Sequence, residues 1–193
     1  MQAELRYVVQ LTLQNPRAAA RHLMGWQLPI SAVWLALALM AVVSALLSTL
    51  ALLLTPMQSE PTMIEPGIKA MLQNPLQVAL LQAVVMVVMA MLAQGVGRLF
   101  GGKGNFADAL VLIAWTEALL CALQLVQIVL MLGSPSLGAA IGLFGMVLFV
   151  WVLSNFIAEM HSFASAGKVL FGIIGTVLAV SVLIAIALVG MKG

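Results

Sequence analysis

Long runs of apolar residues dominate the pattern of hydrophobic and polar positions along this chain. A run of about 20 apolar residues is long enough to cross the hydrocarbon core of a bilayer as an α-helix. Barrel strands would instead show segments of about 10 residues with alternating polarity. The sequence therefore predicts an all-α, polytopic membrane helical bundle with five transmembrane helices, at residues 30–54, 76–97, 109–132, 137–157 and 169–189.

A shorter, amphipathic pattern precedes the first run, over residues 2–14. Its apolar positions recur at helical spacing and are Leu5, Val8, Val9 and Leu13. Spacing of this kind predicts a helix that lies in the membrane interface, with its apolar side among the lipids. Asn15 and Pro16 then predict a helix restart, with Asn15 as the N-cap and Pro16 as the first helical residue.

The pattern divides the chain into two domains. Residues 1–29 are expected to form an N-terminal arm with the amphipathic helix, and residues 30–193 the five-helix transmembrane domain. The first long run begins too late and is too long for a cleaved signal peptide, so we expect a retained membrane helix. The arm and the short loops leave no room for a soluble catalytic domain.

Composition agrees with an integral membrane protein. Of the 193 residues, 64% are apolar and only 7% are charged. A soluble domain of this size would need more charged residues to cover its surface. The formal net charge of +2 is too small to indicate a nucleic-acid partner, so the expected partner is the lipid bilayer. The single cysteine, Cys121, excludes an internal disulfide.

The positions of the cations predict how the helices are oriented, because cytoplasmic loops carry an excess of Lys and Arg. With the N-terminus inside, six of the eight cations are cytoplasmic, and these are Arg6, Arg17, Arg21, Arg98, Lys103 and Lys168. Lys69 and Lys192 then lie outside. We therefore expect a cytoplasmic N-terminus and a C-terminus on the opposite side.

Glu117 is the only formally charged residue inside the long apolar runs. A carboxylate in hydrocarbon is costly, so this position is the first candidate for function. Cys121 and Gln124 lie within about 60° of Glu117 on a helical wheel, which predicts a polar face toward the bundle interior. Two interpretations remain open. Glu117 binds a proton or cation during transport, or it is protonated or hydrogen bonded and holds the helices together.

A glycine-rich loop at residues 101–104 precedes the third run, and Asn105 is expected to cap the helix that follows. The N–H groups of such a loop, with the positive end of the helix, would hold an anionic lipid phosphate. The alternative is a tight turn without a ligand. The cations of this region and of the arm are the expected lipid or anion contacts, and they are Lys103, Arg98, Arg17 and Arg21.

Small residues recur in the fourth and fifth runs. The expected helix-packing positions are Gly138, Gly142, Gly145 and Gly172. Small residues four positions apart let two helices approach closely in a membrane, either within one chain or between copies. The sequence therefore predicts another membrane protein, or a second copy of this chain, as a partner.

Motifs for catalysis, metal binding or cofactor binding are absent. Residues 101–105 are not a phosphate-binding Walker loop, because the Gly-Lys is followed by Gly. His22 and His161 both fall at the cytoplasmic boundary, which argues against a haem held between them. No HExxH pattern, cysteine pair or acidic cluster suggests a metal. We therefore expect a non-enzymatic protein without a cofactor or a bound metal.

The whole arrangement resembles the Yip1 family, most tellingly over residues 101–110 and from Trp151 through His161 to Lys168. The family often has a proline early in the third helix, where this chain has residues 115–117. The long cytosolic segment of the eukaryotic members is missing here, so their binding of small GTPases does not carry over. The resemblance implies the short bacterial type, and hence the bacterial inner membrane with a periplasmic C-terminus.

Two functions of different classes follow from these features. The first is a scaffold, assembly or accessory protein that associates laterally with membrane proteins or lipids, because packing glycines are abundant and catalytic residues are absent. The alternative is a small transporter or channel that uses Glu117 as its proton or ion site. The alternative predicts a cavity that reaches Glu117 beside Gln82, Gln94 or Gln124, and a discontinuous helix.

Overall fold

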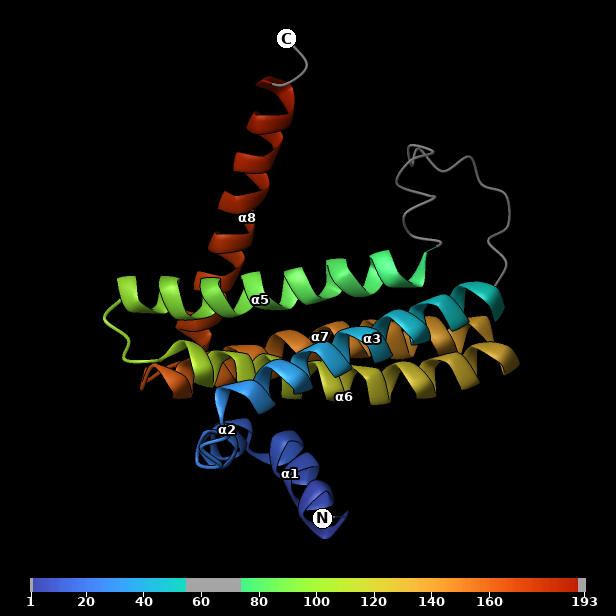
Figure 1. The fold of residues 1–193 in the computed structure, drawn as a ribbon, viewed down its shortest axis with the longest axis horizontal. Coiled ribbons are helices and arrows are strands. Elements are labelled where there is room, and N and C mark those ends of the chain that lie inside the picture. The colour runs from blue at the N-terminus through green and yellow to red at the C-terminus, as the bar shows by residue number, and fades with distance from the viewer. Residues whose placement is uncertain (1, 55–73, 191–193) are drawn as a thin grey trace.

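The structure is a computed structural model, which describes residues 2–54 and 74–190. In this part of the chain the secondary structure is entirely helical (Figure 1). The helices are α1 (Gln2–Gln14), α2 (Pro16–Met24), α3 (Ile30–Leu54), α5 (Pro75–Leu99), α6 (Phe106–Gly133), α7 (Pro135–Met160) and α8 (Ala166–Gly190).

Five helices are long and apolar enough to cross a membrane, which confirms the predicted spans. The first agrees with its predicted bounds, and the others extend slightly beyond their apolar runs. The extensions follow from helix-starting residues, because Asn74 and Asn105 accept backbone N–H bonds as N-caps and Pro75 and Pro135 occupy first turns. Asn15 caps α2 in the same way, as predicted.

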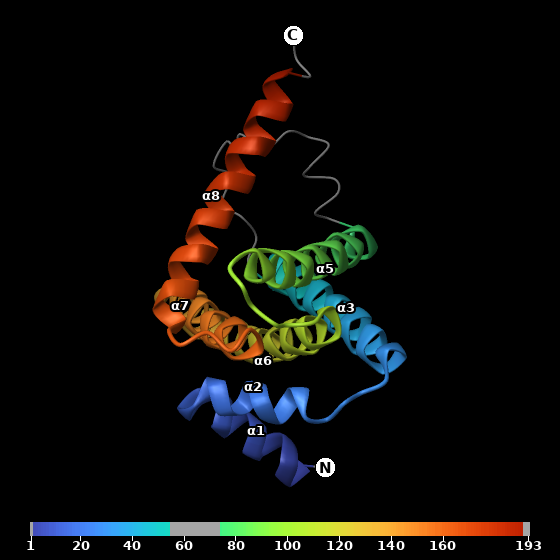
Figure 2. The same ribbon diagram turned by 90° about the vertical axis from the view of Figure 1, so that its left-hand side faces the viewer.

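Four of the long helices form a bundle from which the fifth departs. In Figure 1, α3, α5, α6 and α7 run roughly alongside one another, whereas α8 rises steeply away from them. Figure 2 shows the same four helices nearly end-on, with α8 again directed outward. The main contacts of α8 are with α7. The fold is therefore a packed four-helix unit with a fifth helix attached at one end.

The stripe of small residues in α7 packs against α6. A methyl carbon added at Gly138 would lie 2.8 Å from Met131 Cβ, and one added at Gly145 would lie 2.9 Å from Leu123 Cδ2. Real side chains do not approach so closely, so these glycines permit the observed helix separation. The small-residue pattern is thus used within the chain, in the α6–α7 pair that Ser134 joins.

Gly172 lies in a different environment. In the described part of the chain no neighbouring side chain or other helix lies within 4 Å of a methyl carbon placed on it, because Gly172 lines an open space between α8, α5 and α7. Its predicted packing role is therefore not fulfilled by the described part of this chain. A role against a partner stays a prediction.

The N-terminal arm is packed onto the bundle rather than separate from it. Val8 and Leu23 are buried in the same hydrophobic core as Leu110 and Phe156. Trp115 Nε1 donates a hydrogen bond of 3.1 Å to Thr12 Oγ1, which connects α6 to α1. Figure 2 shows α1 and α2 beneath α6. The sequence boundary at residue 29 therefore does not separate two cores.

The predicted apolar face of α1 is divided between two environments. Val8 is buried against the protein, whereas Leu5 and Leu13 are exposed. The exposed leucines remain available to the membrane interface, as the amphipathic pattern predicts. Contact of this helix with lipid stays a prediction.

Candidate functional site

A polar cavity lies among α3, α5, α6 and α7, inside the apolar part of the bundle. Its volume is about 400 Å³. Glu117 projects into it from α6, and Gln82 Nε2 of α5 donates a hydrogen bond of 2.8 Å to Glu117 Oε1. Its polar lining residues are Ser44, Ser48, Gln82, Glu117, Gln124 and Gln127. The structure thus supplies the polar partner that a carboxyl group in hydrocarbon needs.

Of the two other residues predicted to share this polar face, Gln124 and Cys121, only Gln124 lines the cavity. Gln124 lines the cavity, and its Nε2 donates to Ser48 Oγ over 3.2 Å. Cys121 is buried beside Leu47 and Ile128 and is not a lining residue, but its side chain hydrogen bonds to Ser44, which lines the cavity. Gln94, which the transport alternative named, is likewise not a lining residue.

Close packing of α6 and α7 shapes one wall of the cavity. A methyl carbon at Gly142 would lie 2.8 Å from Gln127 Nε2, so this glycine leaves the space that the amide occupies. Gly142 and Gly145 both line the cavity. The packing glycines therefore also determine the cavity's shape.

Chemically, this cavity can bind a proton or one small cation. It offers a single carboxyl group with amide and hydroxyl groups, and no cluster of three or more His, Cys, Asp or Glu side chains occurs in the described ranges. Each of α5, α6 and α7 is one uninterrupted helix, so the discontinuous helix expected for transport is not found in them.

His161 is the functional-site candidate that sequence reasoning missed. It follows α7 and is only 2% exposed. Its Nδ1 accepts the Gly104 N–H over 3.1 Å, and its Nε2 lies 2.9 Å from the Ala93 carbonyl oxygen. Both contacts are satisfied by the neutral tautomer in which Nδ1 accepts a hydrogen bond and Nε2–H donates one. His161 thereby connects α7, α5 and the glycine-rich loop.

Glycines enclose the His161 ring. A methyl carbon at Gly97, Gly102 or Gly104 would overlap ring atoms, and the Gly104 carbon would lie 2.8 Å from Cε1. Phe163 stacks on the ring with centroids 5.3 Å apart. The sequence signals were an isolated histidine and a glycine-rich loop, which lie in the two stretches that carry the family resemblance, but no local pattern indicated that they are in contact.

The loop at residues 101–104 makes a tight turn between α5 and α6, which the sequence left open as the alternative to an anion site. Gly101 and Gly102 donate their N–H groups to the Arg98 and Gly97 carbonyls, and Gly104 donates to His161. Arg98 Nε donates to the Gly104 carbonyl over 3.2 Å. These three amides therefore already have acceptors within the chain, which removes them as anion donors. Lipid contact by Arg98 and Lys103 stays a prediction.

Two of the three arginines in the arm, Arg17 and Arg21, have a protein partner that was not predicted. Arg17 Nε lies 2.9 Å from Glu159 Oε2, and Arg21 Nη1 lies 2.7 Å from Glu159 Oε1. Arg17 also donates to the carbonyls of Phe163 and Ala164. The hydrogen bonds of Arg17 therefore go to the bundle. The side chain of Arg21 is 59% exposed and can still reach lipid headgroups. Lipid contact by either stays a prediction.

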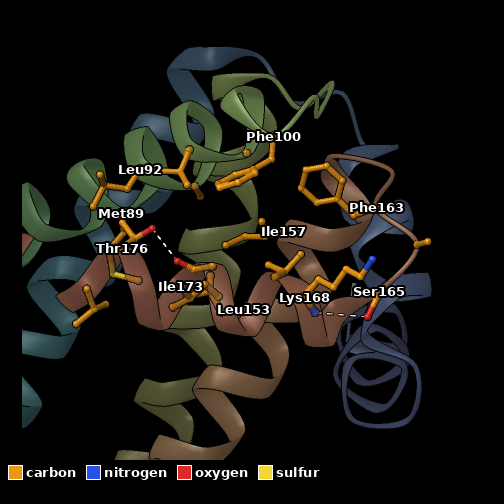
Figure 3. A pocket seen from close by; sticks show the side chains of 17 residues that line it. Met89, Leu92, Phe100, Leu153, Ile157, Phe163, Ser165, Lys168, Ile173 and Thr176 are labelled. Atoms are coloured by element: carbon orange, nitrogen blue, oxygen red, sulfur yellow. Dashed lines mark hydrogen bonds between the residues drawn. The ribbon is translucent and has the colours of Figure 1, made fainter. Parts of the chain in front are cut away.

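A second, larger cavity opens between α5, α7 and α8. Its volume is about 650 Å³, and its lining is almost entirely apolar. Figure 3 shows Lys168 and Ser165 at one end of this cleft and Met89 and Thr176 at the other. We call it the α8 cleft, and we call the end of the bundle that contacts Arg17 the arm end. Lys168 lies at the arm end, because it follows the turn whose carbonyls Arg17 binds.

These features define a multi-pass helical membrane protein with one polar cavity in the span and one apolar cleft beside it. Residues 11–189 match the family model described as the Yip1 domain. This match covers nearly the whole sequence, so the chain belongs to the Yip1 family, as the resemblance had predicted. No curated protein and no solved structure matches it significantly.

Proposed function

We propose that this protein is a non-enzymatic member of the Yip1 family that associates laterally with membrane proteins or lipids, as a scaffold, assembly factor or accessory subunit. The observation that carries the proposal is the position of α8. This helix leaves the bundle and exposes large apolar residues, among them Phe171, Ile174 and Leu178. Helix surfaces of this kind are available to membrane partners.

The proposed location is the bacterial inner membrane, with the N-terminus cytoplasmic and the C-terminus periplasmic. The fold supports this orientation because several of the cations assigned to the cytoplasm meet at the arm end. Arg17 binds the turn before Lys168, and Arg98 binds the loop that His161 holds. An end rich in Lys and Arg is expected on the cytoplasmic side.

Photo-crosslinking in native membranes tests the proposed association. A crosslinking residue at Phe171 in α8 is compared with one at Leu35 in α3, since these side chains are 76% and 72% exposed. We expect discrete protein adducts, or adducts enriched in one lipid class, at position 171, whereas position 35 should give only adducts with bulk lipid. Equal patterns at both positions, together with a clean monomer after purification in several mild detergents, would contradict the proposal.

Transport through the polar cavity is a second candidate function, and the position of Glu117 favours it. The carboxyl group lies in a cavity together with Gln82, Gln124 and Gln127, as an intramembrane proton or ion site would require. The uninterrupted helices argue against transport, because transporters commonly bind their substrates at broken helices. The Gln82 bond suits the structural alternative equally, so a functional measurement must decide.

A Glu117→Gln variant separates these two interpretations. Gln keeps a hydrogen-bonding side chain of similar size but cannot exchange a proton. If Glu117 is the coupling group, proton or cation flux into proteoliposomes falls at least tenfold while the thermal stability in detergent changes little. The matched control is Gln127→Glu, which keeps Glu117 intact in the same cavity. Flux that Glu117→Gln leaves unchanged would exclude Glu117 from transport.

A further inference from the structure

We propose that the α8 cleft binds one anionic phospholipid, with an acyl chain between α5 and α8 and the phosphate at Lys168. The inference deepens the proposed function, on which it rests, by naming the lipid partner and its site. Three observations carry it: the apolar walls of the cleft, its length along the membrane normal, and the unneutralised charge at one end.

The walls of the cleft match a hydrocarbon chain. Leu92 and Val96 of α5, Leu153 and Ile157 of α7 and Ile173 of α8 all line the cleft with apolar side chains. Phe100 and Phe163 narrow the arm end, as Figure 3 shows. Apart from Ser165, Lys168 and Thr176, no lining side chain carries a polar group, so a polar ligand would find few partners along the cleft.

The length of the cleft corresponds to one leaflet. Met89 of α5, a helix of the bundle, and Phe100, which caps the same helix, both line it, and at 1.5 Å per residue these positions are roughly 16 Å apart along α5. Half of a hydrocarbon core of about 30 Å is about 15 Å. Because Lys168 is at the arm end, the cleft spans the depth of the leaflet on that side.

The positive charge of Lys168 at the arm end of the cleft favours an anionic ligand. Lys168 is the only charged side chain among the lining residues, and in the described part of the chain it has no ion pair. It lies in the first turn of α8, which contains no acidic residue. The N-terminal end of a helix is itself positive, so a lysine there is favourable chiefly when an anion is near.

The charge pattern of the cleft distinguishes a lipid from a protein helix. A transmembrane segment of a partner consists of about 20 mainly apolar residues, so it would bring no anion to Lys168. An anionic phospholipid offers an acyl chain to the apolar walls and a phosphate to the lysine.

Lipid retention by the full-length protein tests the inference. The protein is equilibrated with mixed vesicles of equal phosphatidylglycerol and phosphatidylcholine, extracted in a mild detergent and examined by native mass spectrometry. We expect one phosphatidylglycerol to be retained in preference to phosphatidylcholine. Lys168→Gln should lower that preference about fivefold, whereas Lys168→Arg, which keeps the cation at the same position, should leave it nearly unchanged.

A second pair of variants tests whether the cleft binds the acyl chain of the lipid. Gly172 lines the cleft and has no neighbouring atom within 4 Å of an added Cβ, so the side chain of Gly172→Leu would begin in open space and extend into the cleft. Gly175 is equally open but is not a lining residue, which makes Gly175→Leu the matched control. We expect Gly172→Leu to lower lipid retention at least tenfold and Gly175→Leu to have little effect.

Three outcomes would overturn the inference: equal retention of the two lipids by the unmodified protein, an unaltered preference in Lys168→Gln, or equal retention in the two leucine variants. A co-purifying protein that Gly172→Leu displaces without a change in lipid would also overturn it, because the occupant would then be a protein. The crosslinking test at Phe171 is separate from the cleft, since Phe171 is not a lining residue. Loss of the lipid with intact Phe171 adducts would therefore refute the lipid site alone.

Discussion

A Gly97→Ala substitution is expected to lower the free energy of unfolding by about 1–3 kcal/mol, a large effect for one methyl group. The added carbon would overlap Nε2, Cδ2 and Cε1 of His161. The ring cannot move aside, because Gly102 and Gly104 enclose it on other sides and its two nitrogens contact Gly104 and Ala93. Relief would therefore require α5 and α7 to separate at the arm end.

The matched control is Gly95→Ala in the same helix. Nothing lies within 4 Å of an added Cβ at Gly95, so alanine should stabilise the helix by up to about 1 kcal/mol through its higher propensity. Unfolding is followed by tryptophan fluorescence in mixed micelles of mild detergent and sodium dodecyl sulfate. In a His161→Ala background the cost of Gly97→Ala should largely disappear, because the overlapping ring is gone. Equal effects of the two alanines would refute the described packing.

An Arg17→Ala substitution should destabilise the protein by about 1.5–3 kcal/mol, the range for hydrogen bonds of charged groups. Arg17 holds Glu159 and two carbonyls of the turn that connects α7 to α8. Its side chain is 30% exposed and that of Glu159 is 16% exposed, so water replaces these bonds only in part. The loss would free the arm from the bundle and loosen the start of α8.

Arg21→Ala is the comparison that makes this prediction specific. Arg21 binds the same carboxylate, but its side chain is 59% exposed and makes no hydrogen bond to the turn in the described part of the chain. An exposed ion pair contributes only about 0.2–1 kcal/mol. Arg17→Lys should recover part of the stability, since it keeps the charge but loses the guanidinium's several donors. If Arg17→Ala and Arg21→Ala cost the same, the carbonyl contacts contribute nothing.

The number and the approximate extents of the membrane helices were determined by the sequence alone. A span depends on a local property, about 20 consecutive apolar residues, and its ends depend on capping residues such as Asn74 and Asn105. The same local reasoning identified Glu117 as the polar centre, because a charge in an apolar run is conspicuous. The family was likewise recognisable from the sequence, as the match over residues 11–189 confirms.

The faces of the helices could not be deduced in this way. In a soluble protein the polar side of a helix marks the surface, but here the lipid-facing side is apolar as well. Leu80 on α5 is exposed and Met86 on the same helix is buried, although both are apolar. For this reason the sequence did not show that α8 leaves the bundle, or that Gly142 faces α6 while Gly172 faces open space.

Only the tertiary structure brought together the residues that are distant along the chain. Glu159 meets Arg17 across 142 positions, and His161 meets Gly104 across 57. Each partner has an ordinary interpretation by itself: an interfacial charge, a boundary histidine, a flexible loop. Their roles arise because ends of α2, α5 and α7 converge at the arm end, and that convergence depends on helix packing, which no local pattern in this sequence encodes.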